Sequence, residues 1–267
     1  MKKIDYHIHT RFSADSQENE RECVKKAIEM GLDEICFTDH QDINYPNTSF
    51  DLNVEDYFKA MKQLQEEFKD QITIKIGVEI GLNRKYEKEI NEFVNRYPFD
   101  YVIGSIHAIG DQEFYEPALF FKDKTKQQAH LEFFKETLEC VKTFDCFNCL
   151  GHLDYISRYG PYQNSLVDHH IYQEIIDEIF KVLIQKNKGI EINTSGFKLL
   201  KDNGFPNFKQ AQRYYDLNGR IITIGTDSHE CNRVGENVEG VLSHLEKIGF
   251  KKISTFLQRR LDKEKVS

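Results

Sequence analysis

The sequence predicts an α/β barrel of seven parallel strands, and three observations lead to this fold. Short runs rich in Ile, Val and Phe alternate with longer stretches of helical period, which is typical of right-handed βαβ units. The length of 267 residues suits one such barrel. Nearly every run ends in a histidine or an acidic residue, and a barrel gathers the ends of many strands at one face, whereas an open sheet concentrates its chemistry at one switch point.

The elements follow one another regularly along the chain. The seven expected strands are Ile4–His9, Glu34–Thr38, Ile72–Glu79, Tyr101–His107, Cys146–His152, Gly189–Asn193 and Arg220–Thr226. Apolar residues at helical spacing predict the helices Glu18–Met30, Val54–Phe68, Arg84–Arg96, Lys126–Thr143, His169–Lys186, Lys209–Leu217 and Gly235–Ile248. Lys251–Leu257 is expected to add a short strand. No repeat or linker divides the chain, so residues 1–267 are expected to form a single domain.

Composition narrows the classes of function. A net charge of −8 disfavours an extended nucleic acid as a partner but allows a small phosphorylated substrate. No apolar run reaches the length of a membrane span, and no signal peptide follows Met1, so a cytoplasmic location is expected. The six cysteines are therefore expected to be reduced thiols. Cys146 and Cys149 have ligand-like spacing but lack the two further ligands that a structural zinc site needs.

His7 and His9 are the most informative pair, because residues i and i+2 of a strand point to the same face. Histidines and carboxylates recur at or just after later strand ends. The nine candidate metal ligands are His7, His9, Asp15, His40, Glu79, His107, His152, Asp227 and His229. The remaining histidines fall on expected helices: His130, His169, His170 and His244. Nine ligands without a thiolate suit two or three Zn, Mn or Fe(II) ions, with a carboxylate such as Glu79 bridging two of them.

These residues resemble the motifs of the PHP (polymerase and histidinol phosphatase) family of metal-dependent phosphoesterases. The matching motifs are His-x-His-Thr at 7–10, Thr-Asp-His at 38–40, Glu79, Gly-Ser-x-His at 104–107, Gly-His at 151–152 and Gly-Thr-Asp-Ser-His at 225–229. They cover almost the whole chain. The family fold is a distorted seven-stranded (β/α) barrel, in agreement with the seven runs. A stand-alone chain of this length looks most like the family's histidinol-phosphatases, which act in histidine biosynthesis.

The resemblance implies a site for three ions. His7, His9, Glu79 and Asp227 would hold the first ion, and Glu79, His107 and His152 the second. Asp15, His40 and His229 would hold the third, although some relatives have a histidine where this chain has Asp15. The implied reaction is hydrolysis of L-histidinol phosphate to L-histidinol and inorganic phosphate. A hydroxide bridging two ions, held by Glu79, Asp227, His7 and His9, would attack phosphorus without a side-chain nucleophile.

A phosphate group attracts arginine, whose planar guanidinium matches two of its oxygens. Three basic residues follow the fifth, sixth and seventh strands and are expected at the ligand-bearing end: Arg158, Lys198 and Arg233. Histidinol carries an ammonium and an imidazole, so acidic and aromatic side chains are expected around it. Two long loops offer them: Asp42, Tyr45 and Phe50 in Gln41–Asn53, and Phe114, Tyr115 and Glu116 in Ala108–Thr125.

Three alternatives remain open. The first keeps the metals and changes the substrate, as in a mononucleotide phosphatase or a 3′–5′ exonuclease. The second is a metal-dependent amidohydrolase, which also has His-x-His on its first strand but usually has a metal-bridging lysine that is not evident here. The third is a non-catalytic regulatory or binding module, which should have lost ligands that this chain retains. Metal content and turnover separate these alternatives.

Overall fold

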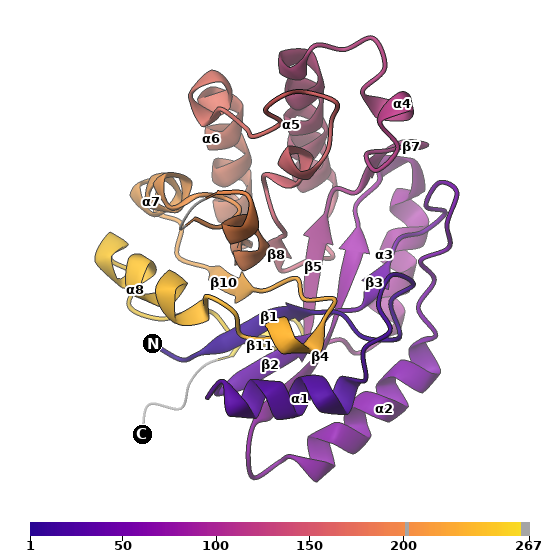
Figure 1. The fold of residues 1–267 in the computed structure, drawn as a ribbon, viewed down its shortest axis with the longest axis vertical. Helices are drawn as coiled ribbons and strands as arrows, with labels where there is room; N and C mark the ends of the chain where they lie inside the picture. The colour runs from indigo at the N-terminus through magenta and orange to yellow at the C-terminus, as the bar shows by residue number, and fades with distance from the viewer. Residues whose placement is uncertain (201–202, 263–267) are drawn as a thin grey trace.

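A computed structural model of the protein describes residues 1–200 and 203–262, so the expected domain of residues 1–267 includes positions outside the described ones. Seven parallel strands form a sheet that curls into a nearly closed barrel (Figure 1). In spatial order they are β1 (Ile4–Ile8), β2 (Glu34–Phe37), β4 (Thr73–Gly81), β5 (Tyr101–Ser105), β8 (Cys149–Leu150), β9 (Gly189–Asn193) and β10 (Ile222–Gly225). A two-residue strand, β3 (His40–Gln41), pairs in parallel with the second half of β4. The predicted fold class is confirmed.

The barrel closes along a seam between its first and last strands. The N–H of Asp227 donates to the carbonyl of His7 at 2.8 Å, and the N–H of His9 donates to the carbonyl of Ser228 at 2.9 Å. These bonds place the residues that follow β10 directly beside the end of β1. Residues from opposite ends of the sequence therefore meet at one end of the barrel.

Helices cover the outside of the sheet (Figure 1). The seven longest are α1 (Glu20–Glu29), α2 (Val54–Glu67), α3 (Glu87–Arg96), α5 (Lys126–Thr143), α6 (His169–Gln185), α7 (Phe208–Asp216) and α8 (Val238–Ile248). Each agrees with an expected helix to within three residues at either end. Side chains satisfy first-turn N–H groups at several of their starts, as Thr125 and Gln128 do in a capping box before α5.

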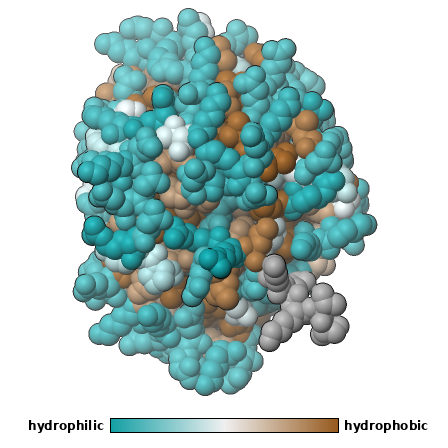
Figure 2. Space-filling view, turned by 180° about the vertical axis from the view of Figure 1, so that it is seen from behind, coloured by the Kyte–Doolittle hydropathy of each residue, from teal (hydrophilic) through white to brown (hydrophobic). Residues whose placement is uncertain are grey.

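Shorter elements follow the strand ends. They are α4 (Pro117–Phe120), η1 (Arg84–Tyr86), η2 (Tyr155–Arg158), η3 (Thr194–Lys198) and η4 (Cys231–Arg233). A hairpin of two short strands, β6 (Ala108–Ile109) and β7 (Gln112–Glu113), follows β5. None of the helices in the described part of the chain is long and apolar enough to span a bilayer. The face in Figure 2 is mainly hydrophilic, with hydrophobic residues between the polar ones.

The C-terminal segment packs against the opposite end of the barrel from the ligands. Of the expected strand Lys251–Leu257, only β11 (Phe256–Leu257) is regular, and it pairs with β12 (Arg260–Leu261). The Phe256 ring lies 5.1 Å from the Tyr101 ring, and the backbone N–H of Phe256 donates to the Tyr6 hydroxyl. This hairpin is antiparallel, so it does not extend the barrel.

One expectation about the cysteines is wrong. Cys23 on α1 and Cys231 on η4 form a disulfide, although they are 208 positions apart in the sequence. The two elements pack against each other beside the barrel seam, which brings the two Cα atoms to 4.5 Å. Sequence spacing carries no sign of this contact. The other four cysteines are free thiols and are buried.

Candidate metal centre

Glu79 is the hub of the site. Its side chain points into the barrel from β4 and is fully buried. Its Oε2 lies 3.0 Å from Nε2 of His7, 3.3 Å from Nε2 of His9 and 3.0 Å from Nδ1 of His40. These three histidines come from the ends of β1 and from β3, so neighbouring parallel strands deliver them to one point.

The second carboxylate oxygen of Glu79 faces a different pair of histidines. Its Oε1 lies 3.2 Å from Nε2 of His107 and 2.9 Å from Nε2 of His152, and it accepts a hydrogen bond from Ser105 at 2.6 Å. His107 and His152 follow β5 and β8. One carboxylate therefore lies between two histidine groups, as a bridging ligand would.

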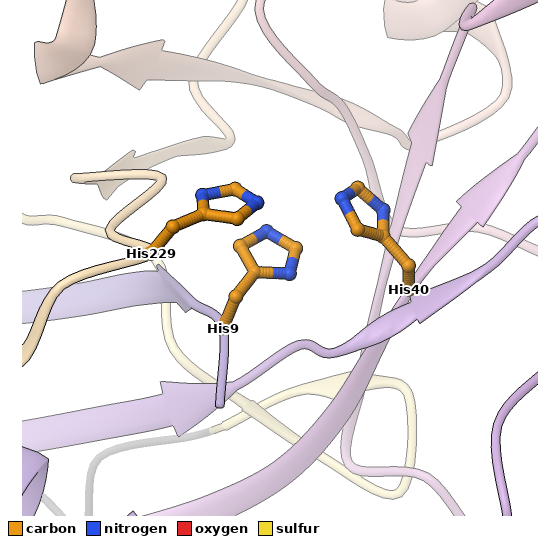
Figure 3. Close-up of side chains that lie close together, drawn as sticks. All are labelled: His9, His40 and His229. Carbon is orange, nitrogen blue, oxygen red and sulfur yellow. The ribbon is translucent and has the colours of Figure 1, made fainter. Parts of the chain in front are cut away.

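Asp227, His229 and Asp15 extend the cluster toward solvent. Oδ1 of Asp227 lies 3.5 Å from Nε2 of His7 and 3.4 Å from Nε2 of His9. In Figure 3 the rings of His9, His40 and His229 converge from three segments of the chain. Asp15 lies at the outer edge, with its Oδ2 3.1 Å from Nε2 of His229 and 3.6 Å from Nε2 of His40.

All nine candidate ligands therefore lie in one continuous cluster. Four groups of donor atoms in it are close enough together to hold an ion: His7, His9, Glu79 and Asp227; Glu79, His107 and His152; His9, His40 and His229; and His40, Asp42 and His107. A further group contains Glu18 with Cys23 and Cys231, but its two sulfurs are bonded to each other. The four remaining histidines lie on α5, α6 and α8, as expected: His130, His169, His170 and His244.

Several buried atoms at the centre have no hydrogen-bond partner in the described part of the chain. Four of them surround one point: Nε2 of His7, Nε2 of His9, Nδ1 of His40 and Oε2 of Glu79. A buried polar atom without a partner costs about 1–3 kcal/mol, and native proteins hold few of them. Four such atoms around one point form a donor set that a bound cation would satisfy. Imidazole nitrogen and carboxylate oxygen are donors that suit Zn, Mn and Fe(II), so the residues fit divalent ions.

The electrostatics keep the two central carboxylates ionised. Burial alone would raise the pKa of Glu79, but the charges of His7, His107 and His40 hold it well below its ordinary value. For Asp227, burial is opposed chiefly by Arg158, and the pKa of its carboxyl is also held well below the ordinary value. Ionised carboxylates are the form that binds a cation.

A layer of groups behind the ligands holds their rings in place, and sequence reasoning missed most of it. Oδ2 of Asp42 lies 2.7 Å from Nδ1 of His107, and Oγ of Ser13 lies 3.0 Å from Nδ1 of His9. Ser13 in turn donates to Asp39 at 2.8 Å. Asp39 lies inside the motif Thr-Asp-His at 38–40, which was the one available signal for it.

A cavity of about 600 Å³ opens beside the cluster. Its walls include charged candidates from the two long loops and the ligand set: Asp15, His40, Asp42, His107 and Glu116. Tyr45, Phe50 and Tyr115 also line it, as do Glu113, Tyr155 and Tyr159, which sequence reasoning did not single out. Phe114 lies in the core instead, with its ring 4.8 Å from that of Phe120.

The basic candidates lie in different surroundings. Arg158 is on η2, where one Nη donates to Oδ2 of Asp227 and to the hydroxyl of Ser195. Lys198 is exposed at the end of η3, and Arg233 pairs with Glu236 at 2.8 Å. None of the three basic candidates lines the cavity, and Arg158 is the one that contacts a candidate ligand, Asp227.

Comparison with known proteins agrees with this geometry. The model of the PHP domain matches residues 5–195. A histidinol-phosphatase of Lactococcus lactis is 43% identical over 100% of this chain and 99% of its own length. A probable histidinol-phosphatase of Clostridium acetobutylicum is 33% identical over 97% of this chain and 98% of its own.

Solved structures show the same relationship. The crystal structure of the Lactococcus lactis histidinol phosphate phosphatase, complexed with zinc, L-histidinol and phosphate, matches with a TM-score of 0.94. That match covers 98% of this chain and 99% of the other at 43% identity. The resemblance noted in the sequence motifs is thereby confirmed. This chain belongs to the PHP family.

Proposed function

We propose that this protein is a histidinol-phosphatase that hydrolyses L-histidinol phosphate to L-histidinol and inorganic phosphate. The observation that carries the proposal is the convergence of unpartnered histidine and carboxylate atoms on Glu79, in a chain that matches the Lactococcus lactis enzyme over its full length. That relative was solved with zinc, L-histidinol and phosphate together. The expected single domain and the cytoplasmic location are part of the same proposal.

Two to three divalent ions fit the cluster, and zinc is the ion present in the relative. His7, His9, Glu79 and Asp227 would hold the first ion. Glu79, His107 and His152 would hold the second. Asp15, His40 and His229 would hold the third, with His9 also close to that group. Such ions would supply Lewis-acid stabilisation of the phosphate oxygens and activate water for hydrolysis.

The chain's own residues position these ligands and the substrate. Asp42 faces Nδ1 of His107. With a proton held on Nδ1, the lone pair of the ring is on Nε2, the nitrogen on the side of Glu79, where it could bind a metal ion. Arg158 lies at the edge of the cluster, next to Asp227, where its guanidinium could bind a phosphate oxygen. We propose that it shares its hydrogen bonds between Asp227 and the substrate. Lys198 and Arg233 are weaker candidates, because Lys198 is exposed and Arg233 pairs with Glu236.

The cavity suits a cationic, aromatic leaving group. Glu113 and Glu116 bring negative charge to its wall, and Tyr45, Tyr155 and Tyr159 bring aromatic surface. An ammonium and an imidazole both interact favourably with such a wall. We propose that the histidinol moiety occupies this cavity while the phosphate faces Glu79 and Asp227.

The test is phosphate release across a panel of substrates by protein of known metal content. The panel contains L-histidinol phosphate, sugar phosphates, mononucleotides and a short single-stranded DNA. We expect kcat/KM for L-histidinol phosphate to exceed the others by roughly 10³-fold or more, since a site built for particular polar groups rejects substrates that lack them. Faster turnover of a mononucleotide or of DNA would replace the proposal with one of the phosphoesterase alternatives. Equal, slow turnover of the whole panel would also contradict it.

A further inference from the structure

The sixth strand of the barrel, β9, contributes none of the nine candidate ligands. Its residues Glu191 and Asn193, with Ser195 just beyond it, are spaced two apart. Residues at that spacing along a strand share a face. Here Glu191 and Asn193 are both buried and hydrogen-bonded to one another at 3.1 Å. They carry polar atoms into the barrel from a strand that gives the metal cluster no ligand.

Glu191 contacts a ligand from each of the two inner groups. Its Oε1 lies 2.6 Å from Nδ1 of His7, which belongs to the first group. Its Oε2 accepts the backbone N–H of His152, from the second group, at 2.9 Å. Asn193 donates its Nδ2 to the same oxygen. Among the described residues, three nitrogens converge on this one carboxylate.

The hydrogen-bonding roles of the neighbouring groups indicate which nitrogen of the His7 ring carries a proton. An ionised carboxylate only accepts hydrogen bonds, and a backbone N–H only donates. Oε1 of Glu191 is placed to accept from Nδ1 of His7, and this contact assigns a ring proton to Nδ1. As a metal ligand the ring is neutral, and its lone pair would then be on Nε2, the atom that faces Glu79 and Asp227.

The backbone leaves room for this arrangement. A Cβ at Gly225 would lie 2.2 Å from Oε1 of Glu191 and 2.3 Å from Cβ of His7. Real Cβ atoms do not approach other atoms this closely, so residue 225 must be glycine for both side chains to keep their places. Gly225 opens the motif Gly-Thr-Asp-Ser-His at 225–229, whose acid and histidine are candidate ligands.

The same layer continues to the basic edge of the site. The hydroxyl of Ser195 donates to Oδ1 of Asn193, and Arg158 donates to that hydroxyl and to Asp227. A chain of hydrogen bonds thus runs from His7 through Glu191, Asn193 and Ser195 to Arg158, and returns to the cluster at Asp227.

We propose that Glu191 is a positioning residue that couples the first and second metal sites, by holding the His7 ring and the His152 backbone with one carboxylate. The proposal rests on the proposed function only in that it requires ions in these two groups. It predicts that the two inner ions are lost together when Glu191 can no longer accept three hydrogen bonds. The third group, with Asp15 at its outer edge, has no contact with Glu191.

Glu191→Gln is the sharpest test, because it keeps the size of the side chain and changes two acceptors into one acceptor and one donor. An amide cannot accept from His7, His152 and Asn193 without placing its own NH₂ group against one of them. The matched control is Asp100→Asn, the same chemical change at a buried carboxylate at the opposite end of the barrel, where Asp100 accepts from Ile76 and Gln258.

The measurement is zinc per chain, determined by elemental analysis in buffers of graded free zinc, with circular dichroism to verify the fold. For Glu191→Gln we expect the half-occupancy point of two ions to move together to roughly 10–100-fold higher free zinc. Asp100→Asn should give the wild-type curve. A curve for Glu191→Gln that coincides with the wild type, or a shift of one ion alone, would overturn the coupling.

Two further outcomes are separable. A wild-type chain that holds no zinc at all would contradict the proposed function, whereas zinc in the wild type with an unchanged Glu191→Gln curve contradicts only the role of Glu191. If Glu191→Gln does not fold, Asn193→Ala tests the same layer from its other side. It should shift the same two ions by roughly 10-fold, the lower end of effects of groups behind metal ligands. No shift in that variant would equally overturn the proposal.

Discussion

The two ends of the barrel contain buried charged groups in opposite states of pairing. At the end covered by the C-terminal hairpin, Asp100 accepts from the N–H groups of Ile76 and Gln258, and Lys188 donates to two backbone carbonyls at 2.8 and 2.6 Å. At the other end, four atoms around Glu79 have no partner in the described residues. Complete pairing is what a structural role requires, whereas several unpaired donor atoms that converge on one point form a set that a bound ligand can complete. The pairing of buried polar atoms thus distinguishes the stabilising end of the barrel from the binding end, without reference to any relative.

The largest effect on activity is expected from a substitution of Glu79, the residue that faces both inner histidine groups. Glu79→Gln removes the charge that faces both inner histidine groups, so we expect both inner ions to be lost. Losing a single oriented donor costs an enzyme roughly 10²–10³ in rate, and losing a bridge between two ions should reduce kcat/KM by at least that much. Steady-state kinetics and zinc content test this, with Asp100→Asn as the opposite case.

Asp100→Asn should instead reduce stability by about 1–3 kcal/mol, by leaving a buried N–H without its acceptor, and should leave kcat/KM within about twofold. Thermal unfolding measures the first effect and kinetics the second. A variant at Asp100 that loses activity while its stability stays constant would break the distinction between the two ends.

Arg158→Ala should have the next largest effect. A hydrogen bond to a charged group contributes about 1.5–3 kcal/mol, so kcat/KM should fall by roughly 10–100-fold. If Arg158 binds phosphate in the ground state, KM rises and kcat changes little. An unchanged KM would show that the contact of Arg158 with Asp227 is its whole role.

Asp15→Asn should have a smaller effect, because Asp15 lies at the outer edge of the cluster and 42% of its side chain is exposed. The expected result is the loss of one ion per chain with a decrease in kcat/KM of about 10-fold or less. Elemental analysis beside kinetics measures both. Loss of every ion from this variant would mean that the outer group supports the inner ones.

The smallest effect on activity is expected at His130, a fully buried histidine on α5 whose two ring nitrogens have no partner in the described chain. Burial, with a contribution from Lys126, lowers its pKa to about 4. The unfolded chain binds a proton near pH 6.5 and the folded chain does not, so stability is lost as pH falls from about 6.5 to about 4, by up to about 3 kcal/mol.

His130→Leu should remove this dependence and leave kcat/KM unchanged at neutral pH. Chemical denaturation of both proteins between pH 4.5 and 7.5 measures the difference. Parallel stability curves for the wild type and the variant over that range would contradict the assignment.

The ligands could be predicted from sequence because their signal is local. A histidine two residues from another in a strand, or directly after an apolar run, shows its position without knowledge of the fold. Glu191 gave no such signal, because within Gly189–Asn193 it reads as an ordinary strand residue whose partners are supplied by β1 and by the residues after β8.

The direction of long side chains and the contacts between distant segments were also beyond sequence reasoning. Lys198 and Arg233 follow strand ends, as Arg158 does, yet only Arg158 turns toward the cluster. The bond between Cys23 and Cys231 depends on how α1 and η4 pack, which no spacing rule describes. Proximity in sequence to a ligand therefore predicts the correct end of the barrel but not the direction of a flexible side chain.

The barrel seam determines when, during synthesis of the chain, the first metal site can form. Asp227, whose N–H closes the seam on His7, leaves the ribosome more than 200 residues after His7 and His9. A nascent chain that lacks β10 and Asp227 has three of the four ligands of the first metal site and an open sheet edge. Tight binding at that site therefore has to wait until Asp227 has been made, and the bound ion would stabilise only chains that have closed.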